Sequence, residues 1–125
     1  MDRLELPFEM RQKSRLRARL PSGEEVRLML ERGTVMRGGD VVRTTDGREI
    51  EIVAAKEKLL HIESDQLARV AYHLGNRHVP VEVGRDFLRI EEDHVLEELA
   101  RQLGARVSHI EAPFEPETGA YHHHE

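Results

Sequence analysis

The sequence predicts an α+β protein with a small antiparallel β domain, a ferredoxin-like βαββαβ domain and a flexible histidine-containing tail. A change in the spacing of apolar residues predicts this division. Up to about residue 57 apolar and polar residues alternate, which is typical of strands, whereas beyond it alternating segments are interleaved with two segments of helical spacing. We therefore place the three parts at residues 1–57, 58–113 and 114–125.

The N-terminal part is expected to form two β-hairpins. Residues 14–20 alternate apolar residues with arginines, and after a turn that contains Pro, Ser and Gly the alternation resumes over residues 26–30. A second pair of strands, at residues 41–42 and 49–53, is separated by a Thr-Asp-Gly-Arg turn of the hairpin type. Short antiparallel strands account for this whole part.

The second part is expected to follow the order strand, helix, strand, strand, helix, strand. The strands are predicted at residues 59–63, 79–83, 87–91 and 107–111. The buried helix stripes are predicted to be Leu67, Val70, Ala71 and Leu74, then Leu96, Leu99, Ala100 and Leu103. Ser64 is expected to cap the first helix and Gly75-Asn76 to end it, while Glu92 or Asp93 caps the second and Gly104 ends it. This order is the ferredoxin-like arrangement. From Phe114 onward no apolar period remains, so a mobile tail is expected.

Composition excludes several classes of function. A formal charge of -5 argues against a nucleic-acid binder, and no stretch is long and apolar enough for a membrane helix or a signal peptide, which favours the cytoplasm. Without cysteine, a metal must be held by nitrogen and oxygen ligands. No HExxH, Ser/His/Asp grouping or phosphate-binding glycine loop occurs, so a metal-dependent hydrolase is disfavoured and no enzyme is expected.

The sequence has eight histidines, and all but His61 follow residue 70. His78 stands just beyond the predicted stop of the first helix, where its imidazole can project freely; a capping or surface histidine is the alternative. His94 begins the second helix. The tail run His122, His123 and His124 favours metals that bind imidazole, although a tag remnant would look the same. Imidazole suits nickel, zinc, copper and cobalt alike.

Several segments together resemble one protein family. They are residues 71–80 (Ala-Tyr-His-Leu-Gly-Asn-Arg-His-Val-Pro), 93–99, 103–104, 11–15 and 32–40. This pattern resembles the UreE family of urease accessory nickel chaperones. The resemblance spans nearly the whole chain, and the ten residues around His78 are its most specific part.

The resemblance implies a homodimer in which His78 of each chain meets its twin and shares one Ni(II) ion, with His122, His123 and His124 as further ligands. Some members carry a His-x-His pair before the second helix, where this chain has Glu92-Asp-His94. One histidine of the two is missing, so His94 is expected to be a weak ligand. The implied partners are the urease apoprotein and its accessory complex, which includes a GTPase, and metal is expected to allow a higher oligomer.

The family's N-terminal domain is likened to the peptide-binding domains of co-chaperones. The basic residues Arg11, Lys13, Arg15 and Arg17 then form either a docking surface for an acidic partner or a solvated strand face. A peptide- or protein-binding module whose tail stores metal is therefore the alternative function.

His61 and His109 raise a separate possibility. They lie on the first and last predicted strands of the second part, which are neighbours in a ferredoxin-like sheet. They are expected either to form an auxiliary metal site or to be two independent surface histidines.

Overall fold

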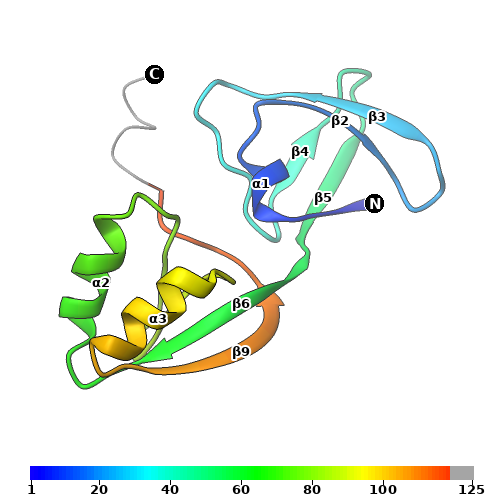
Figure 1. Cartoon of the computed structure of the whole chain (residues 1–125). Helices are drawn as coiled ribbons and strands as arrows, with labels where there is room; N and C mark the ends of the chain where they lie inside the picture. Colours follow the sequence, from blue (N-terminus) through cyan, green and yellow to red (C-terminus); the bar gives the residue numbers. More distant parts are fainter. Residues whose placement is uncertain (119–125) are drawn as a thin grey trace. The chain divides into compact units, whose positions relative to one another are not determined.

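The computed structural model describes residues 1–118, which form α+β structure as predicted (Figure 1). The chain divides into two compact units, with Met1–Ala55 in unit 1 and Lys56–Glu117 in unit 2. The division lies two residues before the predicted one at residue 57. The tail histidines lie outside the described residues.

Unit 1 contains a three-stranded sheet, a two-stranded ribbon and one helical turn. The sheet has the order β1 (Asp2–Leu6), β5 (Glu49–Ala54), β4 (Val41–Arg43); the ribbon pairs β2 (Arg15–Arg19) with β3 (Glu25–Met29); α1 is Phe8–Arg11. Both predicted hairpins are confirmed, since β2–β3 and β4–β5 are antiparallel. The expectation of a wholly antiparallel domain was wrong, because β1 pairs with β5 in parallel. A parallel partner needs a long crossover, which alternation along one segment does not reveal.

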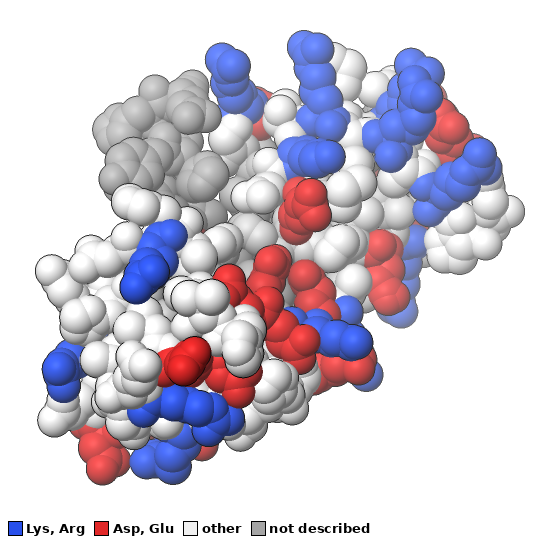
Figure 2. Space-filling view, in the orientation of Figure 1, with Lys and Arg blue, Asp and Glu red and all other residues white. Residues whose placement is uncertain are grey.

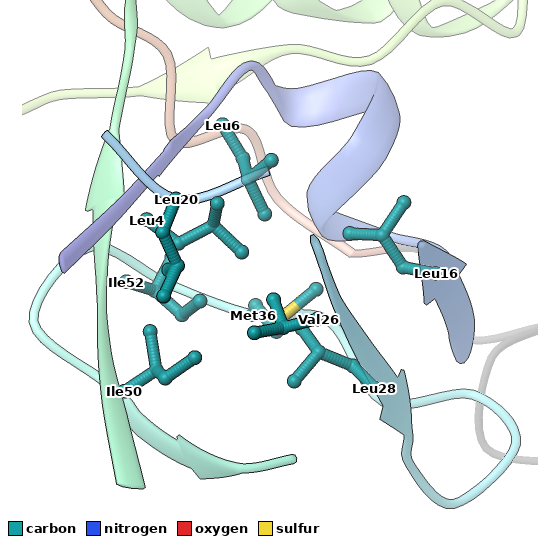
Figure 3. Packing of buried hydrophobic residues seen from close by; sticks show 9 residues of the cluster. All are labelled: Leu4, Leu6, Leu16, Leu20, Val26, Leu28, Met36, Ile50 and Ile52. Atoms are coloured by element: carbon teal, nitrogen blue, oxygen red, sulfur yellow. The ribbon is translucent and has the colours of Figure 1, made fainter. Parts of the chain in front are cut away.

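The core of unit 1 is built from alternate residues of its strands (Figure 3). It consists of Leu4, Leu6, Leu16, Leu20, Val26, Leu28, Met36, Ile50 and Ile52. Met36 reaches this cluster from the loop between β3 and β4 and is almost fully buried. Each such side chain contributes about 1.5–3 kcal/mol on burial.

Unit 2 is one antiparallel sheet with two helices. In chain order it comprises β6 (Lys56–Glu63), α2 (Leu67–Gly75), β7 (Glu82–Val83), β8 (Leu88–Glu91), α3 (His94–Gln102) and β9 (Arg106–Pro113). The strand order β7-β8-β6-β9, with every pair antiparallel, is the predicted ferredoxin-like topology. Figure 1 shows both helices on one face of the sheet. Both predicted apolar stripes pack into the core there.

The predicted N-terminal cap of α3 is confirmed, whereas that of α2 is wrong. Asp93 caps α3, because its side chain accepts a hydrogen bond from the backbone N–H of Leu96 at 3.0 Å. Ser64 does not cap α2: its hydroxyl accepts from the backbone N–H of Gln66 at 3.0 Å, and the helix begins only at Leu67. A short side chain can satisfy a nearby turn instead of a helix end.

The segment Phe114–Glu117, here called the strap, is ordered against unit 2. Phe114 is completely buried and Pro116 is buried as well. The backbone N–H of Glu115 donates to Oε1 of Glu82 at 2.9 Å, and that of Glu117 donates to the Val81 carbonyl at 2.8 Å. The prediction of a mobile tail from Phe114 was therefore wrong for these four residues, because one buried aromatic side chain anchors a segment that has no apolar period.

Candidate metal-binding site

His78 occupies an unusual backbone position. Its φ is 59°, which makes it the one non-glycine residue with positive φ among residues 1–118. Left-handed backbone costs roughly 1–2 kcal/mol for an ordinary L-residue, and histidine is among the residues enriched there. Such strain is characteristic of functional positions. The exposed imidazole of His78 is thus held at a sharp turn of the chain.

His78 lies in the turn that follows α2. As predicted, Gly75-Asn76 ends the helix, since Gly75 is its last residue and Asn76 its C-cap, although Asn76 keeps right-handed backbone angles. The chain continues to turn until His78, whose N–H donates to the Gly75 carbonyl at 3.1 Å. Pro80 then favours extended backbone at Val79. The left-handed backbone position therefore falls at the candidate ligand itself, in the turn after α2.

His73 has a different environment from His78. It lies within the last turn of α2, and its ring meets that of Tyr72 edge-on with centroids 5.3 Å apart. Tyr72 is 65% exposed even though it is aromatic. His73 therefore belongs to the helix, whereas His78 belongs to the turn that follows it.

His94 is the first residue of α3 and is exposed. It lines a shallow depression with Glu97, Glu98 and Arg101. Glu97 and Arg101 form an ion pair with 3.0 Å between Oε2 and an Arg101 terminal nitrogen. His94 therefore lies beside carboxylates, one of which, Glu97, also binds His109. That His94 is a weak ligand stays a prediction.

Of the two alternatives for His61 and His109, the structure supports two independent histidines rather than an auxiliary metal site. In the β6–β9 ladder His61 lies opposite Ser108, whereas His109 lies opposite Leu60, so the two histidines are on opposite faces of the sheet. A one-residue difference in register decides this, and alternation within each strand cannot reveal it.

Each of these two histidines has partners on its own face. The His61 ring accepts a hydrogen bond at Nδ1 from Arg89 Nε at 3.1 Å. The His109 ring lies between two carboxylates, with Nδ1 2.9 Å from Glu92 and Nε2 3.0 Å from Glu97. The hydrogen bonds to Glu92 and Glu97 raise the pKa of His109. Protonated His109 is an ion-pair partner, and in that form it offers no lone pair to a metal.

Within residues 1–118 of a single chain, no group of three or more His, Asp or Glu side chains is arranged to hold a metal ion. His122, His123 and His124 are outside this range. Within the same range no helix is long and apolar enough to span a bilayer.

The predicted basic surface divides into buried and exposed parts. Arg11 is fully buried; its Nε donates to the Leu6 carbonyl at 3.0 Å and a terminal nitrogen to the Met36 carbonyl at 3.3 Å. Its assignment to a docking surface was therefore wrong: it binds the loops of unit 1 together. Lys13, by contrast, is exposed.

Arg15 and Arg17 are exposed on the outer face of the β2–β3 ribbon. There Arg17 lies directly opposite Arg27, and Arg15 opposite Met29, which is 61% exposed. We call Arg15, Arg17, Arg27 and Met29 the basic face. Figure 2 shows several Lys and Arg side chains projecting from unit 1.

Two models of known protein families together match the whole chain. Residues 1–55 match the model of the UreE urease accessory protein N-terminal domain, and residues 48–125 match that of the C-terminal domain. The chain belongs to the UreE family. Its relatives include the urease accessory protein UreE of Cupriavidus necator, 53% identical over 95% of this chain and 64% of the relative. The urease accessory protein UreE of Ralstonia nicotianae is 55% identical over 95% of this chain and 58% of the relative. The urease accessory protein UreE of Azotobacter vinelandii is 51% identical over 97% of this chain and 77% of the relative.

The chain thus spans about three fifths of the length of the first two of these UreE proteins. The C-terminal family model covers the turn after α2, where His78 has positive φ. Sequence reasoning selected His78 but did not reveal the ion pair between Arg89 and Glu82, on the face of the sheet opposite the helices. The burial of Phe114 was likewise not visible in the spacing of apolar residues.

Proposed function

We propose that this chain is a non-enzymatic nickel metallochaperone, which binds Ni(II) reversibly and delivers it to the urease apoprotein during active-site assembly in the cytoplasm. The observation that carries the proposal is the exposed imidazole of His78, held in left-handed backbone at the end of α2. Family membership supports the connection to urease, since the relatives are named urease accessory proteins.

We propose that the site is shared between two copies of the chain. One imidazole supplies a single ligand, but a two-fold axis next to His78 would supply two at once. Two imidazoles leave open positions on nickel, and His122, His123 and His124 are proposed to fill some of them. His94 is proposed as a weak additional ligand. An open site of few ligands suits a carrier that must release its ion.

The same ligand set accepts other ions. Imidazole also binds Zn(II), Cu(II) and Co(II), and Cu(II) is generally bound more tightly than Ni(II). Specific delivery of nickel is therefore proposed to depend on the partner complex, which includes the urease apoprotein and a GTPase. Metal binding should weaken as the pH falls through about 6.5, because a protonated imidazole cannot ligate.

The basic face is the proposed docking surface for an acidic segment of a partner. Like charges placed directly opposite each other destabilise a ribbon, and Arg17 and Arg27 have this arrangement. Glu25 offsets the charge of Arg17 in part, with 3.2 Å between Oε1 and Nε. An acidic segment would relieve the remaining repulsion, and the exposed Met29 offers an adaptable apolar contact. This observation also favours the alternative function, a protein-binding module in which the tail stores metal.

Equilibrium dialysis with Ni(II) tests the proposed function. The variants carry His78→Ala or His73→Ala, each in a chain where His122, His123 and His124 are alanine. Because His78 is then the main remaining ligand, its loss should lower nickel affinity at least roughly tenfold, while His73→Ala should change it little. Unchanged affinity and stoichiometry in the His78 variant would rule out the assignment.

A further inference from the structure

The strand β2 forms the outer edge of the ribbon in unit 1. In the part of the chain that the structure describes, β2 pairs with β3 alone. The other side of β3 is occupied, because Leu28 forms a bridge with Thr44. The N–H of Thr45 also donates to the Arg27 carbonyl at 2.9 Å. An exposed strand edge of this kind can accept a further strand from another chain.

The hydrogen bonds of the ribbon determine which backbone groups point outward from β2. In an antiparallel ladder every second pair of residues exchanges hydrogen bonds, and the backbone groups of the residues between them face the other way. The Leu20 N–H donates to the Glu24 carbonyl at 2.9 Å, so the residues of even number in β2 bind β3. The N–H and C=O groups that point away from β3 are those of Arg15, Arg17 and Arg19.

The side chains beside this edge are strongly basic. Four of the six residues that β2 and β3 place on the outer face of the ribbon are arginine and one is glutamate; the arginines are Arg15, Arg17, Arg19 and Arg27. A depression of about 420 Å³ is lined in part by Arg15, Arg17 and Arg27. Residues directly opposite each other in a ladder point to the same face. An added strand with carboxylates at alternate positions would therefore place one beside each arginine of β2.

The inner face of β2 determines which residues fit between those carboxylates. Leu16 is buried in the core of unit 1 (Figure 3), and Ala18 packs against that core. Residues of an added strand that lie opposite these two would point to the same apolar face and extend it. The edge therefore fits a segment in which acidic and apolar residues alternate. A second copy of β2 does not fit, because it would place arginine opposite arginine.

We propose that β2 binds an extended segment of a partner protein as an additional strand, with acidic residues at alternate positions and apolar residues between them. The proposal rests on the proposed function, because it takes the basic face as a docking surface and specifies how the partner binds there. Backbone hydrogen bonds to Arg15, Arg17 and Arg19 supply affinity, whereas the arginine side chains select an acidic sequence. Docking through side chains alone would leave these backbone groups in water.

Amide exchange with water, measured by NMR on the full chain, tests the added strand. The probe is a peptide in which three glutamates alternate with valines. At saturation it should slow the exchange of the Arg15, Arg17 and Arg19 amides at least about tenfold, because each acquires a hydrogen-bond acceptor. The Leu16 and Ala18 amides already face β3 and should change little, which makes them the internal control. Unchanged exchange at the three arginines, or no binding of the peptide, would overturn the proposal.

Matched peptides separate strand addition from simple attraction of charge. A peptide of the same composition with its glutamates grouped at one end keeps the charge but loses the alternation, so it should bind several-fold more weakly. Methylation of every second backbone nitrogen removes the donors from one edge of the peptide. One alternate set of methyl groups should abolish binding and the other set should leave most of it, because only one edge of the peptide faces β2. Equal effects of the two sets would contradict strand addition.

The docking role and the strand addition can fail separately. Arg17→Ala combined with Arg27→Ala could weaken binding of the urease apoprotein complex while the peptide leaves the arginine amides unprotected; the docking role then stands and strand addition is overturned. If this double variant binds the complex as the wild type does, the docking role is overturned, and with it the partner assigned to this edge. Nickel binding at His78 is measured independently of both.

Discussion

His109 and Glu97 form an ion pair on the helix-covered face of unit 2, with 3.0 Å between Nε2 and a carboxylate oxygen. The other ring nitrogen of His109 binds Glu92 at 2.9 Å. These bonds raise the pKa of His109, and the bond from His109 lowers the pKa of Glu97. The pair joins β9 to α3, so its contribution to the stability of unit 2 depends on pH.

The first prediction is that the His109–Glu97 ion pair stabilises unit 2 only within a range of pH. A raised histidine pKa stabilises the fold fully below its ordinary value of 6.5 and progressively less as the pH rises through the raised value. A lowered Glu97 pKa stabilises the fold above pH 4.5, and this stabilisation is lost as the pH falls through the lowered pKa. Urea unfolding of His109→Gln should therefore show a larger loss at about pH 5.5 than at about pH 9. The control His73→Gln should show no such difference, and an equal loss at both pH values for His109→Gln would contradict the prediction.

The second prediction concerns Arg11. Replacing it with methionine leaves the buried carbonyls of Leu6 and Met36 without these donors, and the free energy of unfolding should fall by about 1–3 kcal/mol. Lys13→Met, at an exposed position, should change it by less than about 0.5 kcal/mol. Chemical denaturation followed by circular dichroism measures both. Equal stabilities of the two variants would mean that the buried guanidinium has no structural role.

The third prediction separates backbone strain from metal binding at His78. His78→Gly should retain or slightly raise stability, because glycine adopts positive φ without cost, whereas His78→Val should lose about 1–2 kcal/mol. Both variants should lose nickel affinity to the same extent, since both lack the imidazole. Thermal unfolding and nickel titration distinguish the two effects. A glycine variant less stable than the valine variant would show that the left-handed turn is not maintained in solution.

The fourth prediction concerns the basic face. Arg17→Ala combined with Arg27→Ala should weaken binding to the urease apoprotein complex several-fold, mainly by slowing association, and the loss should shrink at high salt. Arg43→Ala removes an exposed arginine from β4 and is the matched control. Surface plasmon resonance at two ionic strengths gives the rates. If both variants bind alike, the arginines only solvate the strand face.

The sequence patterns predicted those features that depend on local periodicity. The two hairpins, both apolar helix stripes and the ferredoxin-like order follow from spacing along single segments, and the structure has them all. Features that depend on distant pairing were not predicted. The parallel β1–β5 ladder and the register that separates His61 from His109 arise from contacts between segments far apart in the chain.

Burial by non-periodic contacts was missed for the same reason. Arg11 reads as one more residue of a basic run, yet its guanidinium meets carbonyls 5 and 25 residues away. Phe114 reads as the start of a tail, but it is buried. His78 lies beyond the helix, as the spacing predicted, whereas its left-handed backbone angle could not be predicted from the spacing of residues.

Native mass spectrometry of nickel-loaded protein tests the central proposal most directly. In a chain with His122, His123 and His124 replaced by alanine, a shared site predicts one Ni(II) ion per two chains. Adding His78→Ala should abolish that ion, while His73→Ala should leave it in place. A dimer that keeps its nickel without His78, or a chain that binds one ion per monomer, would contradict the account.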